Sequence, residues 1–391
     1  MIHITKQQAR RFLLLKHGLL GEYKFIGKQG VLDYIRQSGC IQYDPIDICG
    51  KNAELALQSR VKNFTKNMLA ELLYEERVLL DYPDKNTAII LADDWPCFFR
   101  SRNWARNCAA EYPQLMELMT KTLAIIKEKG VVCPDDIQLN SNLQWRSHIV
   151  WSSGNNISSS VLEQLYGAGY IIIHHKKGTR KYYDLTERYL SKELLDTPDP
   201  FADETSYLKW KFMRFIGAIG LLWNRPTDVL PYMKTETRNK IFGALLEESL
   251  ITAVDVEGIK HTFYMHSADM PLMELALKSE ELEWRCELIA PLDCLMWDRR
   301  IINAIFDFEY KWEIYTPVPK RKYGHYVFPI LFGERFIGRI EAIVEKKTRT
   351  LVVKNIWFED DIKLTDEIKT TITNSLKRFA EFNNCGALRI N

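Results

Sequence analysis

The sequence predicts an α+β fold: three tandem winged-helix modules, followed by a small antiparallel β-barrel or sheet domain with a terminal helix. Two observations predict it. Helix, strand, tight turn and strand follow one another in that order more than once, and after residue 280 the chain changes to short alternating apolar and polar runs. A chain of 391 residues, 46% of them apolar, is also too long for one ordinary core. We therefore expect four domains, at residues 1–115, 116–200, 201–280 and 281–391.

The first module is predicted to be mainly helical. Thr5 is a good N-cap residue, Gly39 is a typical helix end, and Pro45 suits the first position of a helix. From these signals and from the spacing of apolar residues, helices are expected at residues 5–17, 30–38, 45–60 and 65–76, and a short strand at residues 78–82.

The second and third modules repeat one order of elements. After a strongly helical stretch at 92–129 and an irregular or partly helical link at 136–149, a helix at 158–167 leads into the strand YIII at 170–173. The basic loop HHKKGTR follows, and the strand KYYDL returns. The third module has a helix at 235–249, the strand LITAVDV, a turn at Glu257-Gly258 and the strand IKHTFYM. Each set predicts the recognition helix and wing of a winged helix.

The last part of the chain is predicted to be a small β domain. Its strand candidates are KWEIYTP, YVFPILFGERFIGRIEAIV and TLVVKNIWF, with turns at residues 332–334 and 346–348. Pro329 lies inside a strand run, which suggests a bulge or an edge strand. A terminal helix is expected at residues 365–382.

Composition points to a reduced compartment. The eight cysteines contain no C-x-x-C pair, and most have apolar neighbours, as buried thiols of a cytosolic protein do. No apolar run is long enough to span a membrane, and the amino terminus lacks the features of a secretory signal. We expect a cytoplasmic monomer without a membrane partner. The net charge is only +2, but 53 basic side chains can still form local patches for nucleic acid.

The stretch IQYDPID, residues 41–47, has two interpretations. In the first, Asp44 caps a helix that starts at Pro45, Asp47 favours the same helix end, and Gln42 is an ordinary strand residue. In the second, Gln42 and Asp44 lie on the same side of an extended segment, because they are two residues apart, and form a polar pair that faces a cleft. The stretch alone favours the first interpretation.

Other catalytic motifs are absent from the sequence. It contains no G-x-S-x-G elbow, no P-loop and no dinucleotide fingerprint, so neither a nucleotide nor another cofactor is expected. His174 and His175 lack partners at metal-ligand spacing, and we expect surface histidines there, with no metal site. No activated lysine nucleophile is evident.

Three groups of basic residues are candidates for DNA contacts. Cations beside an aromatic ring hold phosphates while the ring stacks on a base, and the cations of a wing lie along a groove. Solvated loop lysines are the alternative for the first group, and neutralisation by Asp298 is the alternative for the third. The groups are Lys320, Arg321, Lys322 and Tyr323 on a strand connection, Lys176, Lys177 and Arg180 on the second wing, and Arg299 and Arg300 after Asp298.

Four segments in the same order resemble the winged-helix DNA glycosylases of the YcaQ/AlkZ family. They are IQYDPID with KNAELALQSRV, DDWPCFF, IAPLDCLMWDRR, and YTPVPKRKYGHYVFPILFGERFIGRI. The family's motif is glutamine-x-glutamine or glutamine-x-aspartate, and this chain has the second form. The resemblance implies three winged helices and a β-barrel around a positive channel, with Gln42 and Asp44 as the catalytic pair.

The resemblance further implies excision of bulky alkylated purines, chiefly cationic alkylguanines, and unhooking of interstrand crosslinks. The expected partner is damaged double-stranded DNA, and the expected location is the nucleoid of the cytoplasm. Many relatives carry paired histidines where this chain has Ala53-Glu54, a difference that bears on substrate range. Two other hypotheses remain: a non-enzymatic winged-helix transcriptional regulator, and an RNA-binding scaffold that rests only on the basic aromatic loop.

Overall fold

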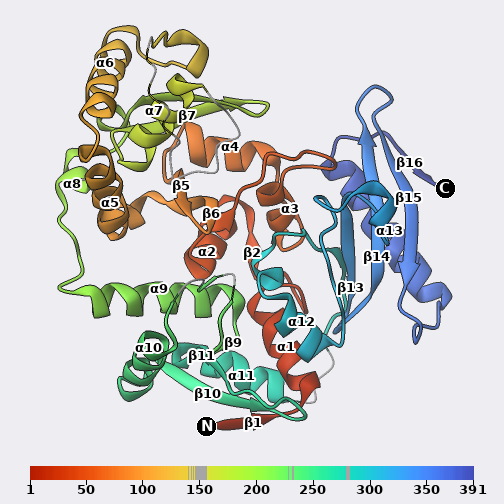
Figure 1. The fold of residues 1–391 in the computed structure, drawn as a ribbon. Coiled ribbons are helices and arrows are strands. Elements are labelled where there is room, and N and C mark those ends of the chain that lie inside the picture. Colours follow the sequence, from red (N-terminus) through yellow and green to blue (C-terminus); the bar gives the residue numbers. More distant parts are fainter. Residues whose placement is uncertain are drawn as a thin grey trace. The chain divides into compact units, whose positions relative to one another are not determined.

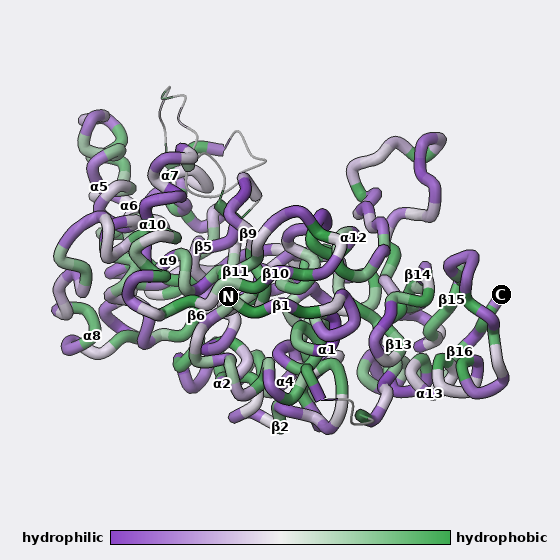
Figure 2. Tube along the Cα trace, turned by 90° about the horizontal axis from the view of Figure 1, so that it is seen from below, coloured by the Kyte–Doolittle hydropathy of each residue, from purple (hydrophilic) through white to green (hydrophobic). Residues whose placement is uncertain are grey.

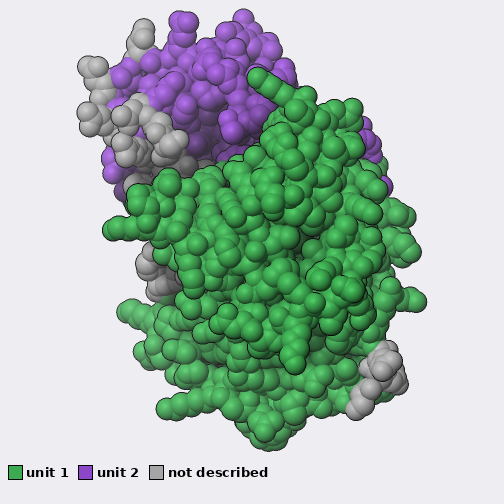
Figure 3. Space-filling view, turned by 90° about the vertical axis from the view of Figure 1, so that its right-hand side faces the viewer, with its two compact units in different colours: residues 1–39, 46–66, 208–391 green, residues 40–45, 67–207 purple. Residues whose placement is uncertain are grey.

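The protein consists of two compact units, each of which contains more than one segment of the chain (Figure 3). In this computed structural model, the described residues are 1–139, 141, 143, 145, 156–227, 229–230, 233–278 and 282–391. Unit 1 comprises Met1–Gly39, Ile46–Lys66 and Leu208–Asn391, and unit 2 comprises Cys40–Pro45 and Asn67–Tyr207. The four sequence-based domains remain a prediction, and the expected link at 136–149 lies partly outside the described residues.

Unit 1 contains the first helices of the chain and its whole carboxy-terminal part (Figure 1). Its helices are α1 (Lys6–Lys16), α2 (Gly27–Ser38), α3 (Asn52–Gln58), most of α9 (Glu204–Ile219), α10 (Thr235–Glu247), α11 (Met270–Leu277), α12 (Arg299–Phe306) and α13 (Asp366–Phe382). Its strands are β1 (Ile2–Ile4), β2 (Phe25–Ile26), β4 (Val61–Lys62), β9 (Leu222–Trp223), β10 (Ile251–Val256), β11 (Phe263–His266), β12 (Cys286–Leu288), β13 (Val327–Phe332), β14 (Arg335–Glu345), β15 (Thr350–Phe358) and β16 (Ala387–Ile390).

Unit 2 contains a three-stranded sheet, a hairpin and several helices. Its strands are β3 (Ile41–Gln42), β5 (Leu79–Asp84), β6 (Asn86–Leu91), β7 (Ile171–Lys177) and β8 (Arg180–Leu185). Its helices are most of α4 (Lys66–Tyr74), α5 (Phe99–Ala110), α6 (Pro113–Lys129), α7 (Ile157–Gly167) and α8 (Lys192–Asp196). Among the described residues no helix combines the length and apolar character needed to cross a bilayer.

Local sequence signals place several elements correctly. Thr5 and Gln8 form a reciprocal capping box at the start of α1, as the N-cap signal predicts. The turn at Glu257-Gly258 joins β10 to β11, which pair antiparallel. β1 then adds to β10 in parallel and β9 adds to β11, giving the strand order β1-β10-β11-β9. These outer strands come from distant parts of the chain and have no local signal.

The helix predicted to start at Pro45 is wrong. Residues 43–51 are not helical, and α3 starts only at Asn52, with Lys51 in the N-cap position. The cause is a long-range interaction: the Ile48 carbonyl accepts the Val344 amide at 3.1 Å, and the Cys49 thiol contacts the Ala342 carbonyl at 3.3 Å. This apolar segment packs on the core under β13 and β14, and that burial outweighs the local preference for a helix. Asp44 therefore does not cap a helix.

The carboxy-terminal strands form one sheet in the order β12-β13-β14-β15-β16. Apolar residues recur along these strands (Figure 2). Phe328, Ile340 and Leu351 belong to a core that also contains apolar side chains of α13. The pairs are antiparallel except β15 with β16, which is parallel. Pro329 lies in β13, which has neighbours on both sides, and the irregularity follows at residues 330 and 331. The predicted bulge therefore occurs, just after Pro329. The alternative prediction, that Pro329 lies in an edge strand, is wrong.

The strand predicted for KWEIYTP is also wrong. Between α12 and β13 the chain is irregular, apart from one short 3₁₀ turn at Val318–Lys320. Instead of joining a ladder, Glu313 folds back: its carboxylate accepts the backbone amides of residues 322, 323 and 324 at 2.9, 2.8 and 3.2 Å. Burial opposes ionisation of Glu313, but these three amide bonds lower its pKa. The result is a fixed loop that carries the predicted basic residues.

A buried histidine in unit 1 makes the stability of the protein dependent on pH. Burial, followed by the nearby Arg60 charge, lowers the pKa of His17 well below 6.5, and its Nε2 lies 3.2 Å from the Ile219 carbonyl. The unfolded chain binds a proton here that the folded chain does not, so stability falls as pH drops below about 6.5. The expected loss of unfolding free energy approaches about 1.4 kcal/mol per pH unit below that pH.

Urea unfolding at about pH 7.5, 6 and 5 measures this slope for the native protein and for His17→Gln. The glutamine retains a donor for the Ile219 carbonyl but does not titrate. The unfolding free energy of the variant should therefore depend on pH less steeply, by about 1.4 kcal/mol per pH unit. Equal slopes for the two proteins would contradict the assignment to His17.

Candidate functional site

The glutamine-x-aspartate segment is an extended edge of the three-stranded sheet in unit 2. β3 pairs antiparallel with β6, with Gln42 opposite Ala88, and the Tyr43 amide donates to the Thr87 carbonyl at 2.8 Å. Strand β3 ends at Gln42, and only a continued extended conformation would put Gln42 and Asp44 on one side and Tyr43 on the other. Gln42 is buried and Asp44 is half-buried. The polar pair of the second interpretation remains a prediction.

Lys176 differs from the surface cation that the sequence predicts. Its side chain is only 4% exposed, and its Nζ lies 2.5 Å from Oδ1 of Asp81 in β5. The same Nζ lies 3.4 Å from the centre of the Tyr43 ring, which is a cation–π contact. Lys176 therefore lies in the interior of unit 2 beside Tyr43, because the strand β7 carries it there.

The hairpin of β7 and β8, which the sequence predicts to be the second wing, has a longer first strand than expected. β7 extends to Lys177, so the tight turn is limited to Gly178 and Thr179, and HHKKGTR is mostly strand. Lys177 is exposed at the tip and lies 5.1 Å from the Tyr182 ring. Arg180 is also exposed, and it pairs with Asp135 at 2.7 Å. Lys177 and Arg180 therefore lie at the surface, and their contact with DNA remains a prediction.

His174 and His175 lie in this strand and contact each other. Their Nδ1 atoms are 2.7 Å apart, and His175 stacks on Tyr182. Burial lowers the pKa of both, so they favour the neutral form.

Asp298 caps α12 and neutralises one of the two predicted arginines. Its carboxylate accepts the Arg300 amide at 3.1 Å and the Arg300 guanidinium at 3.0 Å. The Trp223 indole donates to the same carboxylate at 2.9 Å. Arg299 instead points to Tyr310, at 5.4 Å from its ring centre. Arg300 thus takes part in the helix start, as the alternative interpretation has it, but its side chain is 49% exposed and its contact with DNA remains a prediction.

The basic loop held by Glu313 presents both cations and aromatic rings. Lys320 and Lys322 are exposed and Arg321 is half-buried, with its Nε donating to the Thr316 carbonyl at 2.8 Å. Tyr323 already contacts Trp357 and Arg339, so its ring is held by the protein. Tyr315, in contrast, is 85% exposed. The sequence indicates Tyr315 as one of the aromatic residues beside these cations, but its exposure within an irregular loop has no sequence signal.

Ala53 and Glu54, which stand where many relatives carry paired histidines, both lie in α3 and have different structural roles. Ala53 is buried in α3, while Glu54 accepts the Lys51 amide at 3.1 Å in the capping box and lies 3.6 Å from the Lys66 ammonium. Glu54 is therefore committed to the fold of unit 1.

One group of potential metal ligands occurs among the described residues: His17, Asp293 and Cys294, all buried. The Arg60 guanidinium binds Asp293, and burial raises the pKa of the Cys294 thiol to about 12. An adjacent guanidinium and a protonated thiol both oppose the binding of a cation. All eight cysteines are free thiols, as the sequence predicts.

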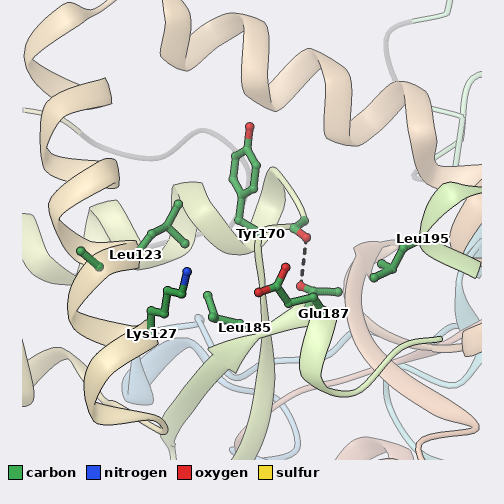
Figure 4. Close-up of a pocket in the computed structure, with 9 residues that line it drawn as sticks. Leu123, Lys127, Tyr170, Leu185, Glu187 and Leu195 are labelled. Atoms are coloured by element: carbon green, nitrogen blue, oxygen red, sulfur yellow. Dashed lines mark hydrogen bonds between the residues drawn. The ribbon is translucent and has the colours of Figure 1, made fainter. Parts of the chain in front are cut away.

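A cavity of about 360 Å³ in unit 2 lies apart from the predicted residues (Figure 4). The Thr186 hydroxyl donates to the Gly169 carbonyl at its wall, at 2.9 Å. The side chains labelled in the figure are Leu123, Lys127, Tyr170, Leu185, Glu187 and Leu195. Neither Gln42 nor Asp44 lines this cavity, so we assign it no part in catalysis.

Comparison with known proteins gives a family and a fold. The family described as "DNA glycosylase AlkZ-like" matches residues 35–382 of the chain. Among solved structures, that of the Streptomyces sahachiroi DNA glycosylase AlkZ is similar over 100% of both chains, with a TM-score of 0.65 and 14% sequence identity. At this identity the structural similarity concerns the fold, and it confirms the mixed α+β class.

Proposed function

Because the chain belongs to the AlkZ-like DNA glycosylase family, we propose that it is a monofunctional glycosylase that excises bulky alkylated purines from double-stranded DNA. The observation that supports this proposal is that Gln42 lies in the edge strand β3 and that the Tyr43 amide still binds Thr87, since an extended segment continued to Asp44 would put Gln42 and Asp44 on one side. The proposed substrates are cationic alkylguanines, and they include interstrand crosslinks joined through such guanines.

The chemistry suits this pair. A guanine alkylated on its imidazole ring carries a positive charge, so it leaves with the electrons of the glycosidic bond and needs no general acid. The sugar then develops positive charge at its anomeric carbon. An ionised Asp44 stabilises that charge and takes a proton from the attacking water, while the Gln42 amide orients the water. Water supplies the new bond to carbon, so the reaction is a hydrolysis.

The loop held by Glu313 is the proposed phosphate-binding surface of unit 1. Lys320 and Lys322 are exposed there, and the three amide bonds to Glu313 fix the loop before DNA arrives. Tyr315 has the exposure needed to stack on a base. In unit 2, Lys177 and Arg180 are the proposed wing contacts, and Lys176 is not among them. Arg299 remains a proposed contact of unit 1.

Loss of the two loop lysines is expected to weaken DNA binding in a salt-dependent manner. For Lys320→Ala/Lys322→Ala, the slope of log K against log salt concentration should become less steep by about two, since each phosphate contact contributes about 0.9. Fluorescence anisotropy with a labelled duplex measures this slope. The control is Lys363→Ala/Lys369→Ala, which removes two exposed lysines near and on α13. Equal slopes for the two double variants would contradict the proposed surface.

The activity itself is tested with duplex DNA that carries one guanine alkylated at N7, or one nitrogen-mustard crosslink. We expect release of the modified base and an abasic site that alkali cleaves. Release no faster than the spontaneous rate would reject the proposed function. Binding that follows one palindromic sequence, independent of damage, would instead favour a transcriptional regulator, which the family match does not favour.

A further inference from the structure

We propose that Lys176 is a positioning residue for the catalytic segment: held by Asp81, its ammonium fixes the Tyr43 ring and thereby the direction of Gln42 and Asp44. This inference rests on the proposed function, since it assigns a task to residues that support the catalytic pair. Every residue involved belongs to unit 2, and the contacts join three separate segments of that unit.

The first step is a bulge that turns Lys176 inward. In the β7–β8 hairpin, Ile173 pairs with Tyr183 and His175 pairs with Tyr182, so His174 is an extra residue in β7. An extra residue shifts the alternation of the strand, and the side chains that follow it exchange faces. Lys176 thus shares the face of the buried Ile173, whereas strict alternation would send it to the opposite face.

The second step is the anchor that holds this bulge. Arg77 donates from its guanidinium to the carbonyl of Ile173 at 3.2 Å and to that of His174 at 2.9 Å. Its guanidinium carbon also lies 4.6 Å from the centre of the Tyr189 ring. A bulge disrupts the ladder locally, and Arg77 satisfies the two carbonyls at that point. The position of Lys176 is therefore fixed by the backbone and does not depend on the rotamer alone.

The third step is the buried ion pair. Asp81 lies within β5 with its side chain fully buried, and its other oxygen, Oδ2, accepts the Tyr74 hydroxyl at 2.9 Å. Burial and the Asp81 charge together raise the pKa of Tyr74, so this hydroxyl stays a donor. Asp81 is thus held on both oxygens and cannot follow Lys176 if the lysine moves.

The final step connects this pair to the catalytic segment. The Lys176 Nζ lies 3.4 Å from the Tyr43 ring centre, and the Tyr43 amide is bound to Thr87. Tyr43 is fixed at both its ring and its backbone, and its two neighbours in sequence are Gln42 and Asp44. Buried ion pairs contribute little net stability compared with apolar replacements, so orientation of Tyr43 is the better explanation for a charged pair at this place.

The test removes the Lys176–Asp81 ion pair with a variant that should still fold, so that an effect on positioning is distinguished from unfolding. Lys176→Met alone leaves Asp81 buried without its cation and risks unfolding, so the principal variant is Lys176→Met/Asp81→Leu, an apolar replacement of the pair. The matched control is Lys192→Met/Asp196→Leu, which removes an exposed pair of the same residue types in α8. Lys176→Arg retains the charge, the ion pair and the cation–π contact.

We expect the principal variant to fold and to lose about 10- to 100-fold in single-turnover excision rate, as small misplacements of catalytic groups do, with its Kd for DNA within about threefold. The control and Lys176→Arg should keep the excision rate within about threefold. Hydrogen exchange of the Tyr43 amide should accelerate in the principal variant only. A folded principal variant with the native excision rate would overturn the inference.

Failure of this inference can be distinguished from failure of the proposed function. If the native protein excises no alkylated base, the proposed function fails, and the Tyr43 amide still reports on positioning. Unchanged exchange of that amide in the folded principal variant overturns the inference in either case.

Discussion

Replacing Asp44 by asparagine is expected to reduce the single-turnover rate of base excision by about 10²- to 10³-fold, the usual effect of removing one preorganised electrostatic group. Asparagine has nearly the same shape but neither stabilises the cationic sugar nor takes a proton from water. DNA affinity should stay within a few-fold, because Asp44 makes no proposed phosphate contact. Alkaline cleavage of a labelled duplex with one N7-alkylated guanine measures the rate.

The matched control is Asp47→Asn, which removes a carboxylate three residues further along the chain. Burial opposes ionisation of Asp47, but its bond to Lys346 and the Gly50 amide lower its pKa, so it too is charged at neutral pH. Its loss should change the excision rate by less than about threefold, since it lies outside the catalytic pair. If both variants lose rate equally, the effect is one of local charge, and the role assigned to Asp44 is wrong.

The second large effect is expected on stability, from the buried pair of Arg60 and Asp293 in unit 1. Both side chains are fully buried, and Arg60 also donates to the Tyr34 hydroxyl. Arg60→Met leaves Asp293 charged and without its cation in the interior, which typically costs about 3–5 kcal/mol. Urea unfolding of the native protein and the variant measures the difference.

A second variant distinguishes charge from packing. Arg60→Met/Asp293→Asn removes both charges while the asparagine oxygen still caps the Leu295 amide, which Asp293 binds at 3.0 Å in the native protein. This double variant should recover a large part of the lost unfolding free energy. If it is as unstable as the single variant, loss of the Arg60 side chain from the packing is responsible.

Sequence signals predicted the fold well wherever short-range interactions decide it. The capping box at Thr5 and the hairpin turn at Glu257-Gly258 depend on neighbouring residues only, and both are confirmed. The helix expected at Pro45 has equally good local signals. It fails because Ile48 and Cys49 bind β14, almost 300 residues away along the chain. No local sequence pattern shows that residues 45–51 will bind β14 and will not start a helix.

The same limit applies to the candidate site. Gln42 and Asp44 came from a motif and a resemblance, and their roles remain a prediction. Lys176 was expected on the wing together with Lys177 and Arg180, because all three fall in the basic stretch HHKKGTR that was predicted to be a loop between two strands. Its inward direction results from one extra residue in β7 and from Asp81, 95 residues earlier, and neither has a signature in the sequence.

The connectivity of unit 2 restricts how this protein can be divided. The six residues Cys40–Pro45 are the only part of the described unit that precedes Asn67, and they supply the strand β3. A fragment of residues 67–207 would keep the hairpin of β5 and β6 but lose the strand that bears Gln42. A fragment of residues 1–66 would keep that strand without its partner. A division of the chain at residue 66 therefore separates this motif from the sheet that holds it.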